Sequence, residues 1–86
     1  MTLANAEIMA LKGLGFLVNS GAPMDRFLAL TGTDARELRH RAAEPEFLAA
    51  VMDFFLSDEA LLTVFCEDAS IDPQDIQIAR QALPGA

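Results

Sequence analysis

The sequence predicts an all-α fold: a six-helix compact bundle built from two similar three-helix units, within a single helical domain that covers residues 1–86. Helix start signals (Asp, Ser or Thr followed by Pro or an acid) and stop signals (Gly or a turn cluster) recur along the chain. No stretch alternates polar and apolar residues as a half-buried strand does. The chain is 52% hydrophobic, which provides for a core and argues against disorder.

The first half of the chain predicts three helices, at residues 5–18, 23–30 and 34–43. In the first, residues at helical spacing recur on one face: Ile8, Leu11, either Leu14 or Gly15, and Val18. Pro23 is tolerated in the first turn of the second helix, and Gly32 supplies the left-handed residue after its end. Asp34 and Glu37 have the spacing of a capping box at the start of the third.

The second half predicts three more helices, at residues 45–56, 58–66 and 73–83. The first of these is apolar almost all round, which is typical of a central, buried helix. Ser57 is expected to cap the next helix, and Asp72 with Pro73 opens the last.

A shift of 38 residues aligns the two halves of the chain. Residues 16–19 then match residues 54–57, and Asp34 matches Asp72. Because apolar positions, caps and loop lengths agree together, we interpret the halves as an internal repeat, about residues 8–42 and 46–80.

The chain is acidic, with a formal net charge of −7, and the charge is uneven. Residues 1–43 hold five Lys or Arg against four acids, whereas residues 44–86 hold one Arg against nine acids. This balance argues against a general binder of nucleic acid or of anionic membranes. Most acids fall near helix starts, where capping explains them, and the alternative is an acidic face for a basic partner.

Several features predict a cytoplasmic protein that does not span a membrane. Cys66 is the single cysteine, so no internal disulfide can form. No apolar run reaches the roughly 20 residues that a bilayer requires. No basic segment followed by an apolar stretch opens the chain, so a signal peptide is not predicted.

No catalytic constellation stands out, and we expect no enzymatic activity, cofactor or metal. His40 and Cys66 are single residues on different helices, so they predict no metal cluster. Gly13 and Gly15 lack the third glycine and the preceding strand of a dinucleotide site, and are more typical of close helix approach. The acidic pairs at helix starts are explained by capping rather than by acid–base catalysis.

The third predicted helix is the one basic feature. It carries Arg36, Arg39 and Arg41, and together with the second helix and Gly32 it resembles a helix-turn-helix in outline. This gives one alternative function, nucleic-acid binding through these arginines. Cations near a helix end also favour the negative end of the helix dipole, and the acidic net charge makes nucleic acid the weaker interpretation.

The leading hypothesis is a non-enzymatic protein-interaction or regulatory module with an unknown protein partner, in the simplest case a second copy of itself. In so small a domain, the adjacent Phe54 and Phe55 are not expected to face one core, so we expect part of the fourth or fifth helix to contact a partner. A further alternative is a small-molecule carrier with an apolar pocket between the two halves.

Three segments carry a family resemblance: residues 26–32 (RFLALTG), 47–59 (FLAAVMDFFLSDE) and 79–85 (ARQALPG). Over nearly its whole length the chain resembles the family of domains of unknown function numbered 3572, found mainly in alphaproteobacteria. The loop at residues 20–23 departs from it, because acidic residues are more usual there. The resemblance implies a bacterial, cytosolic, helical protein; it implies no activity, and no site residue can be carried over.

Overall fold

The computed structural model describes residues 1–85 and contains, in this range, six α-helices and no strand. The predicted all-α, six-helix fold is therefore confirmed. The helices, in chain order, are α1 (Leu3–Val18), α2 (Ala22–Thr31), α3 (Leu38–Arg41), α4 (Pro45–Leu56), α5 (Glu59–Ala69) and α6 (Pro73–Ala82).

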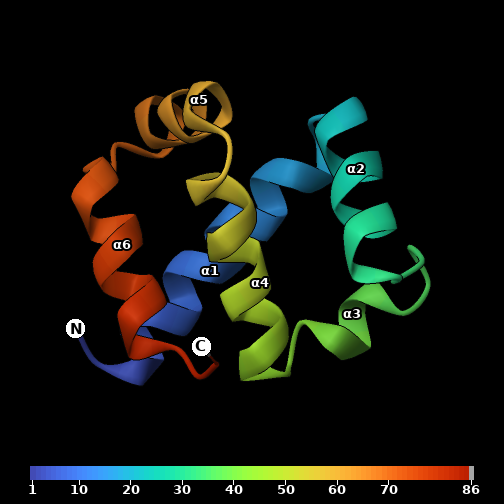
Figure 1. Cartoon of the computed structure of the whole chain (residues 1–86), viewed down its shortest axis with the longest axis horizontal. Helices are drawn as coiled ribbons and strands as arrows, with labels where there is room; N and C mark the ends of the chain where they lie inside the picture. Colours follow the sequence, from blue (N-terminus) through green and yellow to red (C-terminus); the bar gives the residue numbers. More distant parts are fainter. Residues whose placement is uncertain (86) are drawn as a thin grey trace.

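Helix α4 runs through the middle of the molecule (Figure 1) and packs against α1, α2, α5 and α6. Helices α5 and α6 lie on one side of it, and α2 and α3 lie on the other. Helix α1 passes behind α4 and also packs against α6. The expectation of a central fourth helix holds, since seven of its residues are buried: Phe47, Leu48, Ala49, Val51, Met52, Phe54 and Phe55.

Phe54 and Phe55 are both buried within the chain, 8% and 0% exposed, and the expectation that they cannot share its core is wrong. Consecutive helical residues point about 100° apart, so the two rings serve two sides of α4. The ring of Phe54 meets Phe27 of α2 at 5.3 Å, and the ring of Phe55 stacks on Phe65 of α5 at 4.6 Å between centroids.

The apolar residues that recur at helical spacing do not mark the buried face of α1, apart from Leu14. The buried residues are smaller ones for the most part: Ala6, Ala10, Gly13, Leu14 and Leu17. The larger Ile8, Leu11 and Val18 are exposed instead. Small residues let α1 approach α4 closely: a Cβ atom added to Gly13 would lie 2.8 Å from Cε2 of Phe55. This confirms close helix approach for Gly13, whereas Gly15 has nothing within 4 Å of such an atom.

Helix α3 is shorter than predicted. The capping box forms, since Glu37 N donates to Asp34 Oδ1 at 2.9 Å and Asp34 N donates to Glu37 Oε1 at 3.3 Å. Residues 35–37 nevertheless form a turn, and the helix occupies only Leu38–Arg41. Pro45 disfavours helical backbone at the residue before it, and Glu44 is extended with φ −91° and ψ 120°. The chain between Gly32 and Pro45 therefore holds a single helical turn.

The predicted cap of α5 is displaced by one residue. Asp58 is the cap, and its Oδ1 accepts a hydrogen bond from Leu61 N at 3.1 Å. Ser57 instead ends α4, where its hydroxyl donates to the carbonyl of Phe54 at 2.8 Å.

The internal repeat stays a prediction. Each half consists of a longer helix followed by two more helices. The third helices differ, however, because α3 has four residues and α6 has ten. Among residues 1–85, no helix combines the length and apolar character that a bilayer crossing requires.

The two glycines of α1 predict opposite effects of alanine. Gly13→Ala forces a methyl group against the buried ring of Phe55, and should lower the free energy of unfolding by about 1–2 kcal/mol. Gly15→Ala meets open space and gains helix propensity, which should raise it by about 0.5–1 kcal/mol. Urea unfolding at low micromolar protein, followed by circular dichroism, measures both. Equal effects of the two substitutions would contradict the packing described for α1.

Candidate functional site

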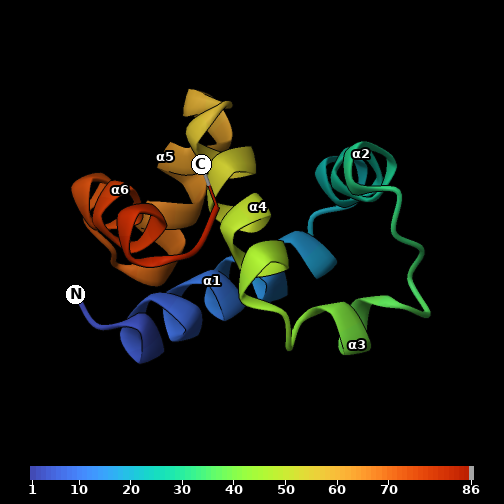
Figure 2. The same ribbon diagram turned by 60° about the horizontal axis from the view of Figure 1, so that its bottom comes forward.

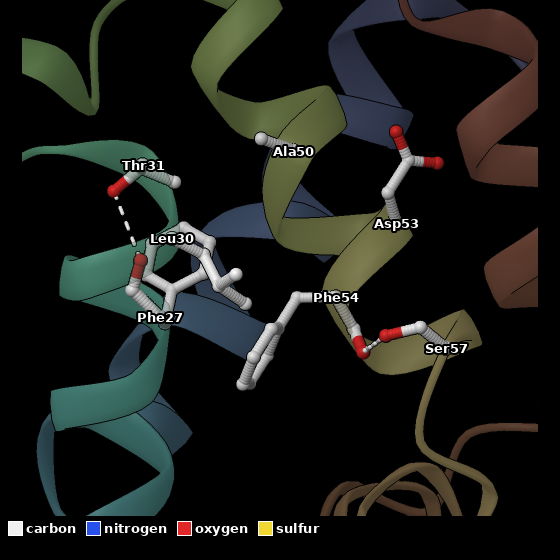
Figure 3. Close-up of a pocket in the computed structure, with 7 residues that line it drawn as sticks. All are labelled: Phe27, Leu30, Thr31, Ala50, Asp53, Phe54 and Ser57. Atoms are coloured by element: carbon white, nitrogen blue, oxygen red, sulfur yellow. Dashed lines mark hydrogen bonds between the residues drawn. The ribbon is translucent and has the colours of Figure 1, made fainter.

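A groove between α2 and α4 is the candidate site (Figure 3), with a cavity volume of about 340 Å³. Its lining is mostly apolar and comes from both helices: Phe27, Leu30, Thr31, Ala50, Asp53, Phe54 and Ser57. The sequence predicted an apolar pocket only in general terms, and Phe54 is the only residue of this set that it singled out as a candidate site residue.

Leu30 is the feature that makes the groove unusual. Phe27 anchors α2, since its ring is buried against Phe47 at 5.4 Å and Phe54 at 5.3 Å between centroids. Leu30 follows three residues later and therefore lies on a neighbouring part of the same helix face. It is 75% exposed, the largest value among the exposed large hydrophobic residues of the described chain. The groove therefore places a solvated leucine beside buried aromatic rings.

The hydroxyl groups that line the groove are engaged with the main chain. Thr31 Oγ1 donates to the carbonyl of Phe27 at 3.0 Å, and Ser57 Oγ donates to the carbonyl of Phe54 at 2.8 Å (Figure 3). Within residues 1–85, every buried side-chain polar atom has a hydrogen-bond partner. The groove is thus suited to apolar side chains rather than to a ligand that needs convergent polar groups.

Two ion pairs flank the groove. Arg26 donates to Asp58 Oδ2 at 3.3 Å, and its guanidinium lies 5.8 Å from the ring centroid of Phe54. Arg80 Nε donates to Asp53 Oδ1 at 2.7 Å, while the Asp53 side chain keeps 56% of its surface exposed. Each flank therefore pairs one arginine with one carboxylate, and the Asp53 carboxylate stays partly accessible.

Of the three arginines predicted to share one helix, the structure leaves Arg39 and Arg41 on α3 and places Arg36 outside it. Arg36 lies in the turn before α3, exposed and 3.8 Å from Asp34, and Arg39 is exposed on α3. A helix of four residues cannot present a series of side chains as a recognition helix does. The predicted helix-turn-helix outline is therefore not the geometry of this chain.

The side chain of Arg41 is held in place by contacts within the chain. Its Nε donates to Glu44 at 3.0 Å, and its NH1 donates to the hydroxyl of the buried Thr33 at 3.2 Å. The guanidinium also lies over the ring of Phe47, 4.9 Å from its centroid. These contacts hold the α3 segment to the start of α4.

Cys66 is 4% exposed, as expected for a core thiol. Burial raises the pKa of this thiol, and the carboxylates of Asp72 and Asp75 raise it further. In residues 1–85 no three His, Cys, Asp or Glu side chains are grouped so that they could hold a metal ion.

The comparison with family models decides the family. A model described as "Protein of unknown function (DUF3572)" matches residues 3–86. The chain belongs to the DUF3572 family. No curated protein and no solved structure matches it. The family resemblance seen in the sequence is therefore confirmed, and the DUF3572 description assigns no activity to any of the residues above.

For this DUF3572 chain, the contacts of Arg41 predict a role in stability. Arg41→Ala removes an ion pair, a hydrogen bond to a buried hydroxyl and a cation–π contact, and should lower the free energy of unfolding by about 1–2 kcal/mol. Arg36→Ala, at an exposed position, should change it by less than about 0.5 kcal/mol. Chemical denaturation measures both, and a larger loss from Arg36→Ala than from Arg41→Ala would refute this assignment.

Cys66 should react slowly with thiol reagents while the chain is folded. Reaction requires an accessible thiolate, and a raised pKa leaves less thiolate at pH 8 than a free cysteine has. We expect labelling by a chromogenic disulfide reagent to be at least about tenfold slower in native protein than in guanidinium-unfolded protein. Equal rates would show that the thiol is accessible in the folded state.

Proposed function

We propose that this chain is a non-enzymatic protein-interaction module that seats the apolar face of an amphipathic helix, supplied by a partner protein, in the groove between α2 and α4. The observation that carries the proposal is Leu30, a solvated leucine beside the rings of Phe27 and Phe54. Burying it under a partner would remove its apolar surface from water.

The dimensions of the groove support a helical occupant. Along α4 the groove is lined from Ala50 to Ser57, about 10 Å of helical rise, which matches about two turns of a bound helix. An amphipathic helix of that length anchors through apolar residues at spacings of three and four. A small molecule is less well supported, because the groove is open and its hydroxyls donate to main-chain carbonyls.

The acidic excess of the second half of the chain supports a partner with basic residues beside its apolar face. Asp53 lies at the rim with much of its side chain exposed. The half of the chain that contains α4 holds one Arg against nine acids. Lysines or arginines flanking the bound helix would approach this surface favourably.

The proposal predicts that a lysine-flanked helical peptide with leucines at positions i, i+4 and i+7 binds and shifts the amide signals of α2 and α4 in NMR spectra. Leu30→Asp should raise its dissociation constant at least about tenfold, because it places a charge against the apolar face. Val64→Asp is the matched control: Val64 is also exposed and helical but lies on α5, so binding should stay within about twofold.

Two results would contradict the groove assignment. One is a peptide of the same composition without the leucine spacing that binds equally well; the other is a Leu30→Asp variant that binds like the wild type.

A photo-crosslinking residue at position 30, compared with one at position 64, then tests natural partners in a cell lysate. A crosslinked species that disappears on nuclease treatment would favour nucleic acid instead.

A further inference from the structure

The outward face of α1 carries a continuous row of exposed residues that are small or apolar: Ala4, Ile8, Leu11, Gly15 and Val18. Ile8, Leu11 and Val18 are 53%, 45% and 54% exposed. In Figure 2, the N-terminal half of α1 lies at the lower left edge of the molecule, and no other helix is drawn beneath that half. The row lies on a different face of α1 from the residues that pack against α4 and α6, and all five of its members are exposed in the described chain.

We propose that this row is a dimer interface, at which α1 pairs in parallel with α1 of a second copy of this chain. The surface is separate from the groove between α2 and α4, and the proposal does not depend on the function assigned to that groove.

The spacing of the row is that of a coiled-coil seam. Successive members are four, three, four and three residues apart, which places Ile8 and Gly15 at a positions and Leu11 at a d position of a heptad. A β-branched residue at a with leucine at d favours two parallel helices. Gly15 has open space where a Cβ atom would lie, so packing within the chain does not require a glycine at this position. The absence of a side chain allows a second helix to approach α1 closely.

The charges of α1 favour the parallel orientation. Glu7 and Lys12 are its only charged side chains, and neither takes part in the ion pairs formed within residues 1–85. They occupy the g position of one heptad and the e position of the next. In a parallel pair these positions face each other across the seam, so Glu7 of each copy meets Lys12 of the other. An antiparallel pair brings like charges together instead.

The zero net charge of the α1 side chains also favours a second copy of this chain as the partner at this face. The chain has a net charge of −7, so most faces of two copies repel each other. Helix α1 contributes one positive and one negative side chain, and therefore provides a face on which two acidic molecules can approach without a local charge penalty.

The small area of the seam indicates a weakly bound dimer. Sixteen residues make a helix about 24 Å long, and a strip of that length covers about 250 Å² per copy, well below the roughly 800 Å² of a stable interface. An interface of this size belongs to the weak, transient class.

Sedimentation equilibrium between about 10 µM and 1 mM tests the interface. The wild type should pass from monomer towards dimer over this range, and Leu11→Asp should stay monomeric while its circular dichroism spectrum is unchanged. Val64→Asp on α5 and Leu30→Asp in the groove should leave the dissociation constant within twofold of the wild type. A wild type that is monomeric at 1 mM, or a dimer that Leu11→Asp does not weaken, overturns the proposal.

Charge reversal tests the orientation. Glu7→Lys and Lys12→Glu should each weaken the dimer at least fivefold, and the double variant should restore it to within twofold of the wild type. In the parallel pair, Val18→Cys should form an intermolecular disulfide on mild oxidation, because the two copies of residue 18 face each other at a d position. Failure of the double variant to rescue, together with no disulfide at position 18, would refute the parallel pairing.

Discussion

The fold depends on a continuous chain of aromatic contacts that passes through α4. All six phenylalanines take part, and α4 supplies three of them, with Phe27 on one side and Phe16 and Phe65 on the other. Each aromatic pair contributes about 0.5–1.5 kcal/mol beyond the burial of its area. Because the side chains of Phe54 and Phe55 leave α4 about 100° apart, one helix holds α2 to one side of the molecule and α1 with α5 to the other.

Local signals in the sequence predicted the helices well where a cap or a proline fixes a boundary. Pro45 and the pair Asp72–Pro73 start α4 and α6 as expected. The buried face of α1 could not be predicted from apolar spacing, because that method favours large residues. Ala10 and Gly13 are buried since they let two helices approach, while Leu11 remains outside. Which face of a helix is buried thus depends on distances between elements that lie far apart in the sequence.

The candidate site shows the same limit. The exposure of Leu30 is set by the distance between α2 and α4, and no local pattern encodes that distance. For the basic cluster, the sequence predicted a binding residue where the structure has a packed one. Arg41 contacts Thr33 and the ring of Phe47 only because the α3 segment folds back on α4. The family assignment, by contrast, follows from the sequence alone, since the family model covers residues 3–86.

The peripheral attachment of α2 has a dynamic consequence. Its two buried residues, Met24 and Phe27, dock it on the rest of the molecule, and the segment that follows, up to Pro45, contains only the four-residue α3. Regions with few buried contacts open as cooperative units at a lower free energy than the whole fold. One wall of the groove therefore belongs to the least protected part of the molecule, and an occupant that bridges both walls would spend part of its binding free energy on holding that unit closed.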